Sequence, residues 1–157
     1  MSKFHLKIFL KAAYGLILVF LQFFIILLHF FQWEFLPQKQ IIQASPFSYF
    51  LGILIIIIAF IMMLVSIKDL GRNLSPFPRP INNCNLVTSG IYQFTRHPMY
   101  YSLIFISIGV FIINLSIYYL FLTISLTLII KFKIALEEKY LMNKFKNYLL
   151  YKNEVKV

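Results

Sequence analysis

The sequence has little cysteine, histidine or acidic side chain, and each shortage argues against a class of protein. With a single cysteine, Cys84, the chain cannot form an internal disulfide. Its three histidines, His5, His29 and His97, are scattered, and nothing in the sequence resembles a Cys/His metal cluster. Charged residues make up 13% of the chain, whereas soluble domains carry about 25%. The sequence therefore argues against a disulfide-rich domain, a metal-cluster protein and a soluble domain.

The abundant feature is hydrophobic side chains, which make up 61% of the 157 residues. Several apolar runs approach or exceed the ~18–20 residues that cross a bilayer. We therefore expect an all-α integral membrane protein with one domain over residues 1–157. The first run is too long for a signal peptide and no small-residue cleavage site follows it, so it reads as a membrane helix and signal anchor. The expected membrane helices cover about residues 8–31, 47–67, 99–113 and 116–132.

The last two helices are expected to form a tight hairpin. A single helix from Met99 to Phe132 would be about 50 Å long, well beyond a hydrocarbon core of ~30 Å. Basic residues flank this stretch on both sides, and basic segments prefer the cytoplasmic side. An even number of crossings brings both flanks to one side, with an uncharged turn near Asn114–Ser116.

The same rule orients the rest of the chain. Lys3, Lys7 and Lys11 lie near the N-terminus, whereas the connection over 32–45 carries only Glu34 and Lys39. We therefore expect four crossings, with both termini and the segments 68–98 and 133–157 in the cytoplasm. The net charge of +10 is concentrated at the ends of apolar runs and in these two segments. This distribution favours anionic lipid headgroups over nucleic acid as the partner.

Both cytoplasmic segments combine polar and apolar residues. The first, "KDLGRNLSPFPRPINNCNLVTSGIYQFTRHPMY", has prolines and glycines that prevent a long helix, and interleaved apolar residues that predict an ordered re-entrant or interfacial cap. The second, "KFKIALEEKYLMNKFKNYLLYKNEV", has apolar residues at helical spacing and predicts a C-terminal amphipathic helix that continues the fourth membrane helix. Its adjacent acids, Glu137 and Glu138, suggest a cationic or polyhydroxyl ligand.

Two interpretations are open for Arg96, His97 and Pro98. In the first, Arg96 anchors to headgroups, His97 caps a helix, and Pro98 occupies the first helical turn, where its missing N–H costs nothing. In the second, the helix that starts near Pro98 offers free N–H groups to an anion. Arg96 and His97 would then supply further donors to a carboxylate or phosphate.

The string "LVTSGIYQFTRHPMY", followed by "EEKYLMNKFKNYLLY", resembles the isoprenylcysteine carboxyl methyltransferase family. That family is grouped with the phospholipid N-methyltransferases among the membrane-embedded enzymes that use S-adenosylmethionine. Its pattern is roughly LVTSGxYxxxRHPxY, an apolar hairpin, and then EExxLxxxFGxxYxxY. The resemblance covers about Gly71–Val155, and the sequence departs from the pattern at Ser102, where Gly is common, and at Lys146, which replaces the Gly of FG.

The resemblance implies a pocket in which the two cytoplasmic segments close over S-adenosylmethionine. Lys133 would serve the methyl acceptor, at a position where Arg is usual. His97 and Glu138 would assist catalysis if an amine acceptor must lose a proton. The implied cofactor-binding residues are Asn85, Leu86, Val87, Tyr92, Arg96, His97, Tyr100 and Glu137.

The expected fold is a bundle of four membrane helices with a cytoplasmic cofactor-binding cap and a C-terminal amphipathic helix. The expected function is methyl transfer to a lipid-like acceptor of the isoprenylcysteine carboxyl type or another small lipid. Phosphatidylethanolamine-type N-methylation is the alternative acceptor chemistry, and a non-catalytic scaffold or complex subunit is the alternative class. We expect a lipid or lipid-anchored partner, no metal and no nucleic acid, and a homo-oligomer is compatible with the pattern.

Overall fold

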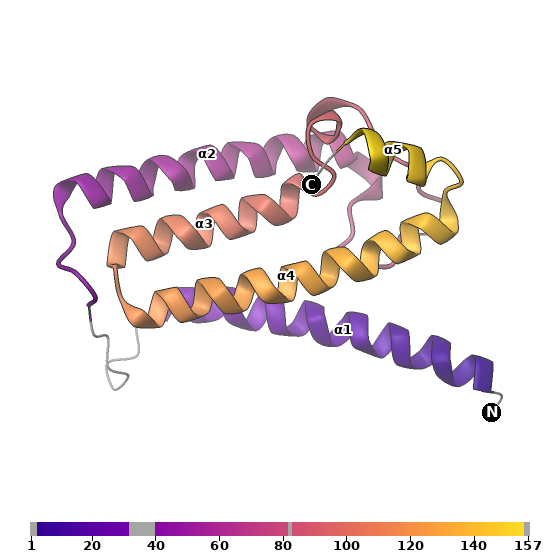
Figure 1. The fold of residues 1–157 in the computed structure, drawn as a ribbon, viewed down its shortest axis with the longest axis horizontal. Helices are drawn as coiled ribbons and strands as arrows, with labels where there is room; N and C mark the ends of the chain where they lie inside the picture. Colours follow the sequence, from indigo (N-terminus) through magenta and orange to yellow (C-terminus); the bar gives the residue numbers. More distant parts are fainter. Residues whose placement is uncertain (1–2, 32–39, 82, 156–157) are drawn as a thin grey trace.

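The computed structural model describes residues 3–31, 40–81 and 83–155, with side chains from residue 13 onward in these ranges. The predicted charges Glu34 and Lys39 of the first connection lie outside the described residues. The described part is helical, which confirms the predicted all-α class (Figure 1). Its helices are α1 (Lys3–Phe30), α2 (Pro46–Leu70), α3 (Pro98–Asn114), α4 (Ile117–Lys144) and α5 (Tyr148–Glu154), with 3₁₀ turns at Gly71–Asn73 and Gly90–Gln93.

Three of these helices are long and apolar enough to cross a membrane. They are α1, α2 and α4, whereas α3 is apolar but shorter, at 17 residues. Large apolar side chains along α1 and α2 remain exposed, as is typical of helices that face lipid. The chain is therefore a multi-pass membrane protein.

The predicted hairpin between the last two membrane helices is confirmed. Leu115 turns the chain in the left-handed region, at φ 46°, and its N–H donates to Phe111 O at 2.7 Å. Ser116 then caps α4 by accepting from the N–H of Tyr119. Ile41 N–H donates to Leu115 O at 2.7 Å, so the end of the α1–α2 connection lies at this turn.

Small residues hold α2 and α3 together in the most extensive helix contact of the described part. A Cβ on Gly52 would lie 2.7 Å from Gly109 O, and a Cβ on Gly109 would lie 2.8 Å from Gly52 O. Ala59 and Ser66 continue this buried face of α2. Because membrane helices associate through close packing, this contact fixes the two ends of the segment 71–97, which joins α2 to α3.

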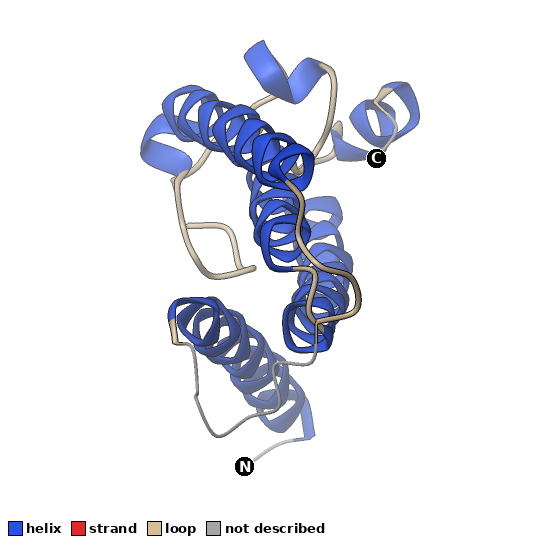
Figure 2. Ribbon diagram, turned by 90° about the vertical axis from the view of Figure 1, so that its left-hand side faces the viewer, coloured by secondary structure: helices blue, strands red, loops and turns tan. Residues whose placement is uncertain are grey.

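Helix α1 packs against α4, apart from the α2–α3 pair (Figure 2). Buried side chains of α1, α3 and α4 form the core between them, namely Ile25, Tyr100, Tyr119, Leu122, Leu126 and Ile130. His29 Nε2 lies 2.7 Å from Ser107 Oγ, and Tyr118 Oη donates to Leu28 O at 2.9 Å. These bonds connect α1 to the hairpin near its turn.

The prediction of one amphipathic helix after the fourth membrane helix is correct as far as Lys144 and wrong beyond it. Phe145 is extended, at φ −116° and ψ 114°, and the short helix α5 begins at Tyr148. Figure 1 shows that α5 folds back toward the segment 71–97. Periodicity could not reveal this break, because the bonds that hold α5 back come from a distant segment.

Candidate active site

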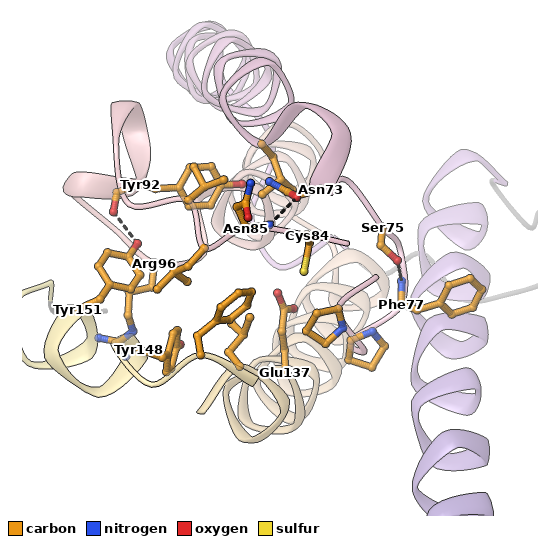
Figure 3. A pocket seen from close by; sticks show the side chains of 17 residues that line it. Asn73, Ser75, Phe77, Cys84, Asn85, Tyr92, Arg96, Glu137, Tyr148 and Tyr151 are labelled. Carbon is orange, nitrogen blue, oxygen red and sulfur yellow. Dashed lines mark hydrogen bonds between the residues drawn. The ribbon is translucent and has the colours of Figure 1, made fainter. Parts of the chain in front are cut away.

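A cavity with both polar and apolar lining lies where the segment 71–97 faces the end of α4 and α5 (Figure 3), and we call it the polar cavity because it is more polar than the neighbouring cavity. The Glu137 carboxylate reaches into it from α4. The cavity brings together most of the predicted cofactor-binding residues, namely Asn85, Leu86, Val87, Tyr92, Arg96 and Glu137. It is also lined by residues that the sequence analysis did not assign, including Asn73, Ser75, Phe77, Tyr148 and Tyr151.

A second, mainly apolar cavity of about 230 Å³ lies beside the first, between α1, α3 and α4. Its apolar wall includes Phe23, Ile26, Met63 and Leu103. Three further predicted residues line this cavity and do not line the polar one, namely His97, Tyr100 and Lys133. The structure thus divides the predicted site into two compartments.

The two cavities share a boundary at Glu137. Tyr92, Arg96, Ser75 and Leu70 also line both cavities. Tyr100 Oη, in the apolar cavity, donates to Glu137 Oε2 at 2.7 Å. A group bound in one cavity can therefore meet a group bound in the other next to this carboxylate.

The Lys133 ammonium is buried in the wall of the apolar cavity, where its residue is 1% exposed. It donates to Gln22 Oε1 at 2.6 Å and to Pro76 O at 3.1 Å, and it lies 5.0 Å from the centre of the Tyr100 ring. Among the residues with described side chains, no carboxylate forms an ion pair with Lys133. Its hydrogen-bond partners are therefore neutral groups, and the Glu137 carboxylate acts on the ammonium from beyond ion-pair distance.

Glu138 has quite different surroundings from Glu137 and lines neither cavity. Its Oε1 accepts from Arg96 Nε at 3.0 Å and Nη2 at 2.9 Å, and its Oε2 accepts from Lys152 Nζ at 2.6 Å. His97 Nε2 lies 3.5 Å from Oε1, without hydrogen-bond geometry. Both carboxylate oxygens are thus engaged by cations, which suits an anchor better than a base.

Helix α5 is held over the polar cavity by the same cluster. Arg96 Nη1 donates to Lys152 O at 3.2 Å and to Val155 O, where a cation suits the carbonyl end of a helix. Tyr151 Oη donates to Tyr92 O at 2.6 Å, a bond drawn in Figure 3. Arg96, predicted as a cofactor ligand, therefore also locks one wall of the cavity.

The tyrosines of the polar cavity are hydrogen-bond donors. Burial raises the pKa of Tyr151 to about 12, and burial also holds the pKa values of Tyr92 and Tyr148 above their usual range. Tyr148 is 1% exposed, and its hydroxyl has no hydrogen-bond partner among the described residues. A buried donor without a partner costs free energy unless a ligand satisfies it.

Several residues of the site were not predicted, although the sequence carries a signal for some of them. Tyr148 and Tyr151 are the tyrosines of the YxxY that ends the second motif, but no role was assigned to them. Gln22 lies in the apolar run of α1, where a lone amide within a membrane helix is itself a sign of function. Asn73 and Ser75 carry no such signal.

These features define a membrane protein in which a more polar cavity adjoins a mainly apolar one. The family model of phospholipid methyltransferases matches residues 47–148, and the chain belongs to this family. The protein is therefore a methyltransferase that uses S-adenosylmethionine and acts on lipid acceptors. Comparison with curated proteins and with solved structures found no match.

The residues of the polar cavity fit S-adenosylmethionine in chemistry. The Glu137 carboxylate suits an amino group or ribose hydroxyls, and the unpartnered Tyr148 hydroxyl suits an acceptor atom. The cavity itself holds only about 90 Å³, whereas ligand sites usually measure about 300–1,000 Å³. Helix α5 forms one wall of this cavity through Tyr148 and Tyr151 and has few backbone contacts with the bundle, so an outward movement of α5 would enlarge the cavity.

Proposed function

We propose that the polar cavity binds S-adenosylmethionine and that the apolar cavity presents the reactive group of a membrane lipid to it. The observation that supports this most directly is the shared boundary at Glu137. A charged cofactor can enter from the cytoplasmic segments, and an apolar chain can lie among α1, α3 and α4. The two reactants then meet without crossing each other's compartment, which is the positioning that methyl transfer needs.

We propose a carboxylate or thiol on a prenyl-like lipid as the acceptor. Lys133 supports this, because its ammonium forms no ion pair with the described side chains and so attracts an anionic acceptor and repels an ammonium, while the Glu137 carboxylate of the same cavity accepts from Tyr100 Oη. Bound S-adenosylmethionine supplies a methyl group on a sulfonium. Transfer to a carboxylate forms the O–CH₃ bond and breaks the S–CH₃ bond, whose electron pair stays on sulfur, and no proton is released.

Phospholipid amine methylation is the second candidate, supported by the description of the matched family. An amine acceptor must lose a proton, and His97, which lines the apolar cavity, is the group available to take it. Glu138 would act indirectly in either case, as a positioning residue that holds Arg96 and α5. Incubation of lipid extracts with labelled cofactor separates the candidates, since methyl esters are base-labile and N-methyl groups are not.

We also propose four membrane crossings with both termini in the cytoplasm. Support comes from the confirmed hairpin at Leu115 and from the bond between Ile41 and Leu115, which puts both short connections at one end of the bundle. The basic residues that follow α2 and α4 lie at the other end, where the polar cavity is. A 17-residue α3 is about 25 Å long, close to the thickness of a thin bilayer core.

The decisive experiment compares Glu137→Gln with Glu154→Gln in the full chain. Glu154 is an exposed acid on α5 and serves as the matched control for the loss of one charge. We expect Glu137→Gln to weaken S-adenosylhomocysteine binding by about tenfold or more, because a charged hydrogen-bond acceptor is lost, and Glu154→Gln to have no effect. Calorimetric titration measures the affinity of each variant for S-adenosylhomocysteine.

Equal affinity of Glu137→Gln and the unchanged protein would remove Glu137 from the cofactor site. No binding to the unchanged protein at millimolar ligand would favour the non-catalytic alternative over the enzyme.

A further inference from the structure

A single amide, Gln22, faces the apolar cavity from within membrane helix α1. Its residue is 6% exposed, and its Oε1 accepts from Lys133 Nζ at 2.6 Å. An ammonium can only donate, so the amide oxygen must face Lys133 and the amide nitrogen must point elsewhere. Within the described part of the chain, Gln22 Nε2 has no hydrogen-bond acceptor, although the residue lines the cavity.

Lys133, like Gln22, has a hydrogen-bond donor without an acceptor among the described residues. Its ammonium carries three N–H donors, and the described residues accept two of them, at Gln22 Oε1 and Pro76 O. The polar wall of the cavity therefore offers free donors from two side chains, one charged and one neutral. A ligand group that only accepts hydrogen bonds satisfies both donors, whereas an ammonium satisfies neither. The Glu137 carboxylate also lines this cavity, and there it accepts from Tyr100 Oη.

We infer that Gln22 is a specificity-determining residue that directs the enzyme toward an anionic acceptor. It orients the Lys133 ammonium through Oε1 and contributes a second donor to the acceptor through Nε2. This inference rests on the proposed function, because it takes the apolar cavity as the acceptor site. Gln22 lies outside residues 47–148, which the family model matches, so this selectivity comes from a helix outside the matched residues.

Two substitutions test the proposed donor role of Gln22, one without and one with an acceptor for Lys133. Gln22→Leu removes both the acceptor for Lys133 and the donor to the lipid, with little change in volume. Gln22→Glu keeps an acceptor 2.6 Å from Lys133 but neutralises its charge and removes the donor. Leu21→Ala is the control on the same helix, because Leu21 is 43% exposed on the lipid-facing side.

The experiment measures binding and turnover with purified full chain in lipid nanodiscs. The probes are an S-prenylated cysteine with a free carboxylate, its uncharged carboxamide, and phosphatidylethanolamine. Binding of the first two without cofactor is followed by microscale thermophoresis. Methyl transfer is followed with labelled S-adenosylmethionine to separate KM for the acceptor from kcat, and S-adenosylhomocysteine affinity reports on folding of the cofactor site.

We expect the unchanged protein to bind the carboxylate about tenfold or more tightly than the carboxamide. Both Gln22 variants should lose this preference and raise KM for the carboxylate acceptor, with unchanged S-adenosylhomocysteine affinity. Leu21→Ala should keep the preference.

Retention of the preference in both Gln22 variants would overturn the inference and leave the proposed function standing. No preference in the unchanged protein, together with methylation of phosphatidylethanolamine, would overturn the proposed acceptor class and the inference with it. Loss of S-adenosylhomocysteine binding in both variants would show that Gln22 supports the fold rather than acceptor selection.

Discussion

At the scale of single residues, the neighbouring acids Glu137 and Glu138 differ in what they can do. Successive residues of a helix point about 100° apart, so one acid lines both cavities and the other faces Arg96 and Lys152. A pair of acids that looks like one feature in the sequence therefore divides into a ligand-facing group and an anchor.

Gly90 is the residue whose replacement should most directly disturb the cofactor site. It has φ 64°, and a Cβ there would clash with Asp69 Oδ2, which accepts from Ile91 N–H at 2.8 Å. We expect Gly90→Ala to shift the 3₁₀ turn that carries Tyr92 and to weaken S-adenosylhomocysteine binding by about tenfold, as backbone strain and a lost bond combine. Calorimetric titration measures the affinity.

Gly71→Ala is the matched control for this prediction. Gly71 also has a positive φ, 53°, but a Cβ there meets nothing within 4 Å. We expect its substitution to lower the melting temperature through backbone strain alone and to leave cofactor affinity unchanged. Equal losses of affinity in the two variants would mean that the contact with Asp69 is irrelevant.

At the scale of secondary-structure elements, α5 is a short helix whose position depends on a few side-chain bonds. Its bonds to the rest of the protein come from Arg96, from the Lys152–Glu138 ion pair and from the Tyr151 hydroxyl. A 7-residue helix has little stability of its own. These bonds therefore decide whether the wall over the small polar cavity is closed.

Removing bonds that hold α5 in place should speed the dissociation of the product S-adenosylhomocysteine. We expect Lys152→Met combined with Tyr151→Phe to raise the dissociation rate of S-adenosylhomocysteine by about tenfold or more, because a charged and a neutral hydrogen bond are lost. Stopped-flow displacement measures the rate. Lys146→Met, at an exposed lysine just before α5, is the control and should leave the rate unchanged. An unchanged rate in the double variant would show that another wall admits the ligand.

At the scale of the whole molecule, the arrangement of helices separates two chemical environments. The tight α2–α3 pair holds both ends of the segment 71–97, and α1 packs against α4 and contacts α3 through His29 and Ser107. The apolar cavity lies between these two parts and the polar cavity lies beyond them. One small bundle can in this way bring a charged cofactor and a lipid to the same carboxylate.

The proposed topology can be tested with the single native cysteine. We expect a membrane-impermeant maleimide to leave Cys84 unlabelled in intact cells and to label it after permeabilisation, because the segment 68–98 is proposed to be cytoplasmic. Gln43→Cys in a Cys84→Ser background, at an exposed residue before α2, should be labelled in intact cells. The reverse pattern would invert the proposed orientation.

Much of this protein follows from its sequence alone. Lengths of the apolar runs and the placement of charge around them determine the membrane helices and the hairpin at Leu115, since these depend on local composition and on the thickness of a bilayer. The resemblance of the two motifs predicts Asn85, Leu86, Val87 and Glu137 as neighbours in a cofactor site, and the four residues line one cavity. These are properties of short stretches of chain, so a sequence can carry them.

Only the tertiary structure decided which residues share a compartment. It put His97, Tyr100 and Lys133 in the apolar cavity rather than the polar one, turned Glu138 toward Arg96, and folded α5 back at Phe145. It also paired Gln22 with Lys133, 111 residues apart in the chain. Such contacts depend on how helices distant in the chain pack together, and no local pattern in any one helix contains that information.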